Sequence, residues 1–236
     1  MLFNKNVTYF VNGKPEVKNN RILFLHIPKT GGTSIEYCLE REIGKGNQRH
    51  NNIRVIEDFI NGQDINEYKI FTVIRNPLDR IISTWRWWVF HKDGYIIRPF
   101  FKHKYGNEKI PYTSFKDYVL MIKDYFDGNA DVSDNSISIK KDKAPLDRRH
   151  IEKLDWWLIK HDTSLIKCDF LKFENLNKEW QKYKKKLKIR GQLKHKNGSL
   201  TIPFTKCRDE LYDEETYRIL SKIYKDEIRR FGYEKG

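Results

Sequence analysis

The most regular hydrophobic pattern in the chain is a series of strand-like apolar runs, each followed by an amphipathic segment. A nearly continuous apolar run at 22–27, ILFLHI, is typical of a strand covered on both faces. Similar runs at 69–75, KIFTVIR, and 165–173, LIKCDFLKF, predict a second and a third strand. With 236 residues the chain can form one α/β domain with a sizeable core, and no internal repeat or linker divides residues 1–236.

Apolar residues at a period of 3.6 predict the helices that follow these strands. After the first strand, Thr33 with Glu36 three residues later fits a capping box and places a helix start near Thr33. After the second, Asn76 as N-cap and Pro77 at the first helical position open a helix that ends near His91. The expected core stripe of this helix is Leu78, Ile81, Ile82, Trp85, Trp88 and Val89, and its opposite face carries Asp79, Arg80, Ser83, Arg86 and Trp87.

The remaining segments carry weaker patterns. Residues 1–20 contain Asn-Gly between β-forming runs, which indicates a hairpin. Residues 92–150 are the least regular part, and the polar stretch at 127–143 is predicted as a loop. The lysine run at 182–188 is interpreted as the solvent-facing side of a helix after the third strand, and a last helix is predicted at about 213–230.

The segment between the first strand and its helix has the residues of an anion-binding loop. Gly31 and Gly32 let the backbone approach a ligand closely, and the N–H groups at a helix start carry partial positive charge. Lys29 adds a full charge, and Thr33 and Ser34 add hydroxyl donors. These groups together favour a cradle for phosphate or sulfate oxygens over an ordinary strand-to-helix turn. The lysine precedes the glycines, so this is not a Walker A loop, and an ATP or GTP hydrolase is disfavoured.

Two further candidates follow the second strand, and a third lies between the motifs. Arg75 ends that strand and Ser83 lies off the core stripe of the next helix. Because ligands bind at the carboxyl ends of strands in open α/β sheets, we expect Arg75 and Lys29 at the same sheet edge. The alternatives are a capping cation for Arg75 and a solvated residue for Ser83. For His50, in a polar segment, spacing alone favours an exposed residue without a role.

Composition narrows the class of partner. The net charge of +14, from 46 Lys and Arg against 32 Asp and Glu, favours anionic partners such as nucleotides, acidic glycans, nucleic acid or anionic lipid. The basic residues are spread along the chain, which weakens the case for nucleic acid. Cys38, Cys168 and Cys207 lie far apart, which disfavours a disulfide framework or a zinc site. The sequence has no leader-like or membrane-spanning stretch, so the expected location is cytoplasmic if the sequence is complete, and the Golgi lumen if it is a trimmed domain.

Two motifs together indicate a family. HIPKTGGTS at 26–34 and RNPLDRIIS at 75–83 resemble motifs of the sulfotransferases that use 3′-phosphoadenosine 5′-phosphosulfate (PAPS). Within them, the chain resembles the carbohydrate branch that includes heparan sulfate 2-O- and 6-O-sulfotransferases, to which LKFENL at 171–176 and RRFGY at 229–233 are also similar. The resemblance implies a P-loop-like, three-layer α/β fold with a central, mainly parallel sheet in a single domain. It is thin over 92–150, which is then expected to be a variable insertion on the acceptor side.

The resemblance also implies roles for the candidate residues. Arg75 and Ser83 would hold the 3′-phosphate, and Lys29 would also neutralise charge on the leaving 5′-phosphate. The family often has a catalytic histidine between the two motifs, which makes His50 the first candidate for the base and His26, in the strand, the second. The 5′-phosphosulfate would be held by the loop residues Lys29, Thr30, Gly31, Gly32, Thr33 and Ser34. A late loop that closes over the nucleotide would contain Lys196, Asn197 and Ser199.

The expected reaction moves a sulfuryl group from PAPS to a hydroxyl of a carbohydrate acceptor, in line and without a metal, and leaves 3′-phosphoadenosine 5′-phosphate. The positive charge suits an acidic glycan, but a neutral glycan or a protein tyrosine stays open. Nucleic acid is not expected as a partner, no membrane segment is expected, and the sequence leaves the oligomeric state open. The alternatives are a P-loop kinase-like nucleotide enzyme, or a non-catalytic basic module that binds acidic glycan or nucleic acid.

Overall fold

The computed structural model describes part of the chain and divides it into two compact units. The described residues are 9–11, 21–43, 50–60, 63–89, 114–129, 131–133, 136–138, 146–189, 191–193 and 204–234. The first unit comprises Met1–Arg75 and Lys153–Gly198, and the second comprises Asn76–Glu152 and Ser199–Gly236. The expected single domain over 1–236 stays a prediction.

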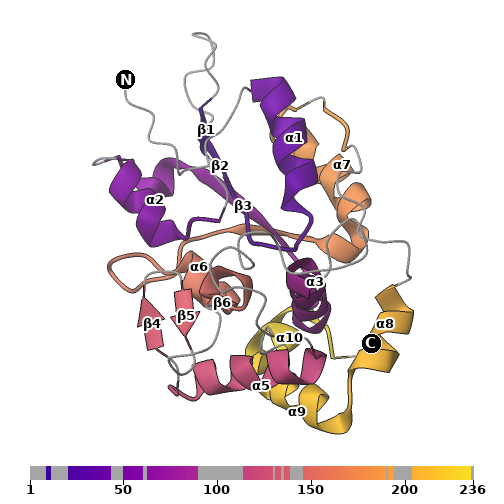
Figure 1. Ribbon diagram of the computed structural model, residues 1–236. Coiled ribbons are helices and arrows are strands. Elements are labelled where there is room, and N and C mark those ends of the chain that lie inside the picture. Colours follow the sequence, from indigo (N-terminus) through magenta and orange to yellow (C-terminus); the bar gives the residue numbers. More distant parts are fainter. Residues whose placement is uncertain are drawn as a thin grey trace. The chain divides into compact units, whose positions relative to one another are not determined.

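The first unit is built on a sheet of four strands (Figure 1). The strands are β1 (Tyr9–Val11), β2 (Arg21–Leu25), β3 (Lys69–Ile74) and β7 (Asp169–Lys172), and their order is β1-β2-β3-β7. β2, β3 and β7 are parallel, whereas β1 is antiparallel to β2. The α/β fold with a mainly parallel sheet is therefore confirmed. The third predicted strand is shorter than expected and begins at Asp169, and the other half of the predicted N-terminal hairpin lies outside the described residues.

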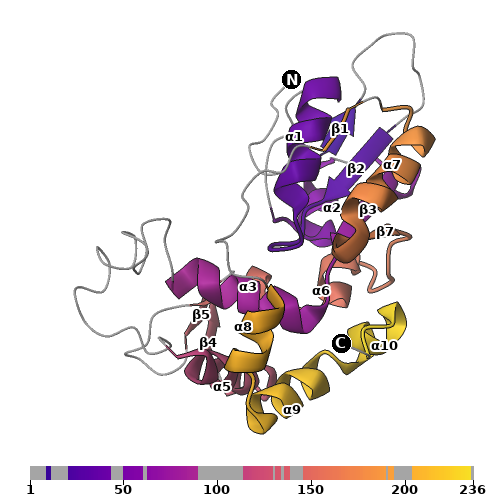
Figure 2. The same ribbon diagram turned by 90° about the vertical axis from the view of Figure 1, so that its right-hand side faces the viewer.

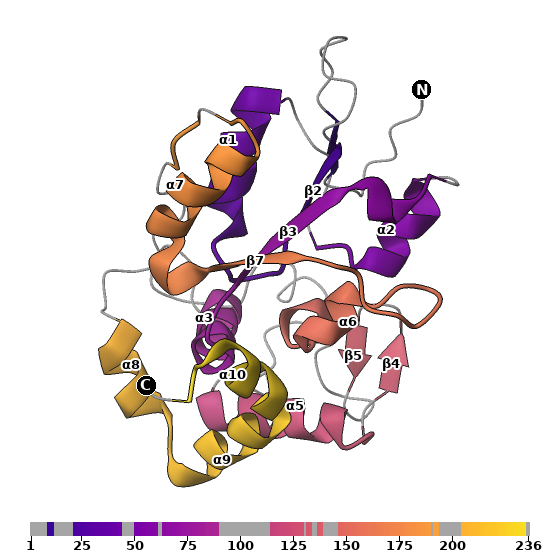
Figure 3. The ribbon, with the colours of Figure 1, turned by 180° about the vertical axis from the view of Figure 1, so that it is seen from behind.

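Helices cover both faces of this sheet. α1 (Gly32–Ile43) and α7 (Leu176–Lys186) lie on one face, and α2 (Ile53–Phe59) lies on the other (Figures 1 and 3). The core under α1 and α7 consists of alternate residues of β2 and β3 together with apolar helix residues: Ile22, Phe24, Ile35, Cys38, Leu39, Phe71, Val73, Leu171, Trp180, Tyr183, Leu187 and Ile189. The short elements of this unit are η1 (Ile65–Glu67), α6 (Leu154–Leu158) and η3 (Phe173–Asn175).

One lysine departs from the prediction for α7. Trp180 and Tyr183 are buried against the sheet as the helical period predicts. Lys184, which was assigned to the solvent-facing side, is only 8% exposed, and its ammonium donates to the Gly191 carbonyl at 3.3 Å. The chain after α7 covers this position, which a helical pattern alone could not predict.

The second unit is mainly helical. Among its described residues the helices are α3 (Pro77–Val89), α5 (Phe115–Phe126), α8 (Phe204–Leu211), α9 (Glu214–Ile223) and α10 (Lys225–Phe231), with the short η2 (Arg148–His150). Figure 2 shows the long helices from a second side. A small antiparallel sheet joins β4 (Asp131–Ser133), β5 (Ser136–Ser138) and β6 (Leu146–Asp147). The core holds Leu78, Ile81, Ile82, Trp85, Phe115, Tyr118, Val119, Met121, Ile122, Ile151, Ile219, Leu220 and Tyr224.

Two predictions for the second unit are wrong. The stretch at 127–143 contains β4 and β5, because β6 supplies a partner strand that a polar sequence does not indicate. The last helix is divided into α9 and α10 at Tyr224, whose backbone leaves the helical region at φ −100°. The Tyr224 side chain is buried and its hydroxyl donates to the Ile151 carbonyl, so a tertiary contact holds the residue where the helix breaks.

The start of α3 confirms the sequence pattern, but its polar face does not. The Asn76 side chain accepts a hydrogen bond from the Leu78 N–H at 3.0 Å, as expected of an N-cap. Arg80 and Ser83, which were expected on the face opposite the core stripe, are both buried. Arg80 donates to the Glu152 carbonyl at 2.7 Å and lies over the Tyr224 ring, so the segment before Lys153 covers that side of the helix.

Candidate functional site

The loop between β2 and α1 has a tight, specific backbone. Lys29 and Gly31 both have left-handed conformations, with φ of 65° and 84°. Such a conformation costs a residue other than glycine about 1 kcal/mol or more, so the surrounding structure must hold Lys29 in place. Part of this support comes from Thr30, whose hydroxyl donates to the Ile27 carbonyl at 2.8 Å, and from the Ser34 N–H, which donates to the Gly31 carbonyl at 3.1 Å.

The first turn of α1 favours an anion. It starts at Gly32, one residue before the predicted position, and contains no acidic residue. Thr33 and Ser34 lie in this turn. The N–H groups at the start of a helix carry partial positive charge, and here no carboxylate in the same turn opposes a bound anion.

Aromatic side chains of the protein itself lie close to the two glycines of the loop. A Cβ at Gly31 would lie 2.8 Å from the Phe173 ring, and a Cβ at Gly32 would overlap the His26 ring. Any larger residue would therefore displace one of these rings. The sequence predicted that the glycines let a ligand approach, and did not predict that aromatic side chains lie against the loop.

Arg75 lies beside the loop. It follows the last residue of β3, and its Nη1 donates to the Lys29 carbonyl at 3.0 Å. Its guanidinium carbon lies 4.3 Å from the centroid of the Phe173 ring, and the residue is only 8% exposed. The prediction that Arg75 and Lys29 occupy the same edge of the sheet is confirmed. The hydrogen bond and the stacking hold a positive charge at the loop.

His26 is held by a carboxylate. Its Nδ1 lies 2.8 Å from Oε1 of Glu36, and the two side chains are only 4% and 7% exposed. Since a carboxylate oxygen accepts and an imidazole N–H donates, the hydrogen of this pair lies on Nδ1 of His26. Glu36 had been predicted as part of a capping box. The structure turns its carboxylate to the histidine instead.

His50 lies against His26. Its Nδ1 donates to the His26 carbonyl at 3.0 Å, and the two ring centroids are 4.5 Å apart at 60°. A carbonyl oxygen can only accept, so Nδ1 of His50 carries the hydrogen, and neutral His50 has its lone pair on Nε2. His50 also has a left-handed backbone, with φ 72°, and is partly buried. The expectation of an exposed histidine without contacts, drawn from spacing alone, is therefore wrong.

The other candidates are not part of this group. Ser83 belongs to the second unit, so its pairing with Arg75 stays a prediction. Lys196, Asn197 and Ser199 lie outside the described residues. Among the residues that the structure describes, no cluster of His, Cys, Asp and Glu could hold a metal ion, and no helix is long and apolar enough to cross a membrane.

Sequence reasoning missed two residues of this site. Phe173 follows β7, stacks with Arg75 and lies against Gly31, and its only sequence signal is its place in LKFENL. Glu36 has a sequence signal only as a capping residue, and no spacing indicates its contact with His26. It lies four positions after Gly32 on the same face of α1, and the fold places the His26 ring against both positions.

Comparison with known proteins gives one match. The model of the sulfotransferase family matches residues 17–234, which is nearly the whole chain. No curated protein and no solved structure matches the chain. The matched region contains the loop at Lys29, the arginine at the end of β3 and the histidine pair, which are the residues that the geometry brings together. The chain therefore belongs to the sulfotransferase family, a family of enzymes of sulfuryl transfer.

Proposed function

We propose that this protein transfers the sulfuryl group of 3′-phosphoadenosine 5′-phosphosulfate to a hydroxyl group of a carbohydrate, and that His50 is the base. The observation that carries the proposal is the arrangement of three groups in the first unit. A helix start without acids, an arginine anchored to the same loop and a histidine with a defined tautomer lie together at the carboxyl ends of parallel strands. Parallel α/β sheets bind their ligands at this edge.

The donor would use the positive groups of the loop. N–H groups at the start of α1 would bind oxygens of the 5′-phosphosulfate, with Thr33 and Ser34 as hydroxyl donors. Lys29 would neutralise the charge that develops on the leaving 5′-phosphate. Arg75, together with Ser83 as a predicted partner, would bind the 3′-phosphate. Lys196 and Asn197 would close over the nucleotide.

In the reaction, the acceptor oxygen attacks sulfur as the bond between sulfur and the 5′-phosphate oxygen breaks. The acceptor proton passes to Nε2 of His50, and 3′-phosphoadenosine 5′-phosphate leaves with the electron pair of the broken bond. In-line transfer of this kind depends mainly on positioning and charge stabilisation, and a general base adds to them. The tautomer of His50 supports this role, because its Nδ1 hydrogen bond leaves the lone pair on Nε2.

The acceptor is proposed as a glycan because the chain resembles the carbohydrate branch of the family, and as an acidic glycan because of the charge of the protein. A surplus of +14 raises the local concentration of anionic saccharides through long-range attraction. An acidic or already sulfated glycan therefore fits better than a neutral one.

The experiment is transfer of labelled sulfate from PAPS to a panel of acidic and neutral glycans and a tyrosine peptide. We expect labelled acidic glycan with the wild type, and strongly reduced labelling with Lys29→Ala. Lys153→Ala, which removes an exposed lysine of the same unit, is the matched control. ATP with Mg²⁺ should give no phosphorylated product. Phosphate transfer from ATP would favour a kinase-like enzyme, and glycan binding without transfer would favour a binding module.

A further inference from the structure

The least expected group near the anion-binding loop is a buried acid. The Glu36 side chain is 7% exposed and lies in a helix whose start is proposed to bind an anion. Removing a carboxylate from water costs several kcal/mol unless a partner compensates. The hydrogen bond to His26 supplies such a partner, so the carboxylate is tied to one orientation of that ring.

Two contacts define where the His26 ring lies. Glu36 binds Nδ1 at one edge, and Gly32 lies against the edge formed by Cδ2 and Nε2. The Phe24 ring stacks on His26 with the centroids 5.7 Å apart. A ring with these neighbours has little freedom to turn.

His50 in turn rests on His26. The His26 carbonyl accepts from Nδ1 of His50, and the His26 ring lies against the His50 ring. The carbonyl belongs to the main chain directly after β2, whereas the ring is the part of His26 that Glu36 holds. The dependence therefore runs from Glu36 to the His26 ring, and from that ring to the orientation of the His50 ring.

We infer that Glu36 is a positioning residue, which acts through the His26 ring to keep the His50 ring in the orientation that lets its Nδ1 donate to the His26 carbonyl. This inference rests on the proposed function for its catalytic consequence, but not for its structural one. Glu36 touches neither the acceptor nor the donor in this account. His26, the second candidate for the base, becomes part of the support.

The structural consequence can be measured without turnover. In protein with nitrogen-15 in its histidines, nitrogen spectra report which ring nitrogen of His50 carries the hydrogen. We expect the Nδ1–H form in the wild type and a mixture of tautomers in Glu36→Ala. In Glu36→Gln, whose amide oxygen can still accept from His26, we expect the wild-type signal. An unchanged His50 signal in Glu36→Ala would overturn the inference.

Gly32→Ala gives the same readout if Glu36→Ala does not fold. It displaces the His26 ring from the opposite edge and leaves the acid in place. The His50 signal should change there as well. Glu67→Ala, which removes an exposed acid of the same unit, should leave the His50 signal unchanged.

The catalytic consequence is tested with a double-mutant cycle. Glu36→Ala should lower kcat by about 10- to 100-fold, since small misplacement of a reacting group has effects of that size, while KM for the donor changes less than about twofold. In a His50→Ala background, Glu36→Ala should have no further effect on kcat. Effects that multiply would overturn the inference, and so would a Glu36→Gln enzyme as slow as Glu36→Ala. If His50→Ala alone kept full activity, the proposed base would be wrong, and the nitrogen spectra would still decide the role of Glu36.

Discussion

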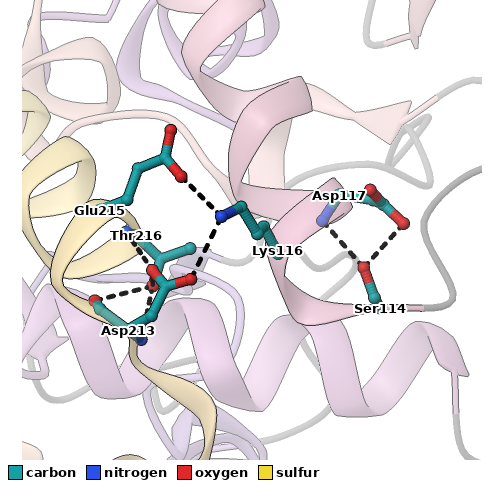
Figure 4. Close-up of polar contacts among 6 residues, drawn as sticks. All are labelled: Ser114, Lys116, Asp117, Asp213, Glu215 and Thr216. Carbon is teal, nitrogen blue, oxygen red and sulfur yellow. Dashed lines mark hydrogen bonds and ion pairs between the residues drawn. The ribbon is translucent and has the colours of Figure 1, made fainter.

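The starts of α1 and α9 differ in the charge of the side chains that lie beside the partly positive N–H groups of the helix. α9 begins with Asp213 in a capping box, in which its carboxylate accepts from the Thr216 N–H at 2.7 Å and the Thr216 hydroxyl accepts from the Asp213 N–H at 3.0 Å (Figure 4). Two further acids, Glu214 and Glu215, lie in its first turn. α1 begins with Gly32 and has no acid in its first turn.

The cations near the two helix starts also differ in what they are paired with. Lys116 of α5 lies 3.3 Å from Asp213 and 2.6 Å from Glu215, so the acids at the start of α9 already have a cation (Figure 4). These contacts raise the pKa of Lys116, with the hydrogen bond to Glu215 as the largest cause. At the start of α1 the cation comes with the loop, as Lys29, and a second cation, Arg75, is bonded to the same loop. A helix start that carries its own acids stabilises the fold, whereas one that carries cations can bind an anion from solution.

The largest effect is expected for the histidine beside α1. His50→Ala should lower kcat by about 10² to 10⁴, because a general base contributes that much. Binding of 3′-phosphoadenosine 5′-phosphate, measured by calorimetry, should stay nearly the same. His161→Ala removes an exposed histidine of the same unit and should keep full activity. Unaltered turnover in His50→Ala would show that His50 is not the base.

An acid placed at the start of α1 should remove the difference between the two helix starts. Thr33→Asp makes the first turn of α1 resemble that of α9. Two like charges about 4 Å apart at an effective dielectric constant near 20 repel by about 4 kcal/mol, so we expect affinity for 3′-phosphoadenosine 5′-phosphate to fall by about 10² or more. The helix should be no less stable, because an acid in the first turn interacts well with its dipole.

Thr33→Asn is the matched variant without charge. It should retain most of the nucleotide affinity while Thr33→Asp loses it. Equal affinity of the wild type and Thr33→Asp would mean that the nucleotide binds elsewhere.

A smaller loss is expected from the arginine of the same site. Arg75→Ala should weaken 3′-phosphoadenosine 5′-phosphate by about 10- to 100-fold, since hydrogen bonds to a charged group contribute about 1.5 to 3 kcal/mol. Arg54 is the control, because its Nε also donates to a main-chain carbonyl, that of Lys160 at 3.3 Å. Arg54→Ala should bind the nucleotide as the wild type does. The assignment of Arg75 fails if calorimetry gives the two variants equal affinities.

The smallest effect is expected at α9. Asp213→Ala removes the capping box and should lower the melting temperature by about 2 to 4 °C without changing transfer activity. Hydrogen bonds from the Thr216 backbone, the Thr216 hydroxyl and Lys116 lower the pKa of Asp213. A carboxyl whose pKa is lowered on folding stabilises the folded state at pH values above its pKa in the unfolded chain, about 3.9. This stabilisation disappears as the pH falls through the pKa of the folded state.

Melting curves at several pH values test this sign. The difference between the wild type and Asp213→Ala should be full near neutral pH and should shrink as pH falls below about 4. A difference that grew at low pH would contradict the assigned role of the carboxylate.

Strand pattern and motif spacing predicted the position of the loop between β2 and α1 well. The loop lies between a buried strand and a helix, and Arg75 follows the neighbouring parallel strand, so the rule that ligands bind at the carboxyl ends of strands was sufficient to place Arg75 and Lys29 together. The same reasoning failed for Glu36. A glutamate three residues after a threonine fits a cap, and only the fold shows that its carboxylate meets His26.

The local hydrophobic pattern did not predict the contacts that each helix makes with segments outside it. The buried Lys184 and Arg80 both occupy predicted polar faces, and each is covered by a segment that the helical period does not report. Phe173 lies against Gly31, although the two residues are more than 140 positions apart in the sequence.

The amino-acid sequence by itself determined the parallel strands, the glycine loop with its lysine, and the position of Arg75 at a strand end, because these depend on local hydrophobic period and on backbone chemistry. Only the tertiary structure decided that His50 donates to the His26 carbonyl and that Glu36 holds His26. Hydrogen bonds between residues far apart in the chain depend on how β2, α1 and the segment before α2 pack, and packing is a property of the folded chain that no local spacing encodes.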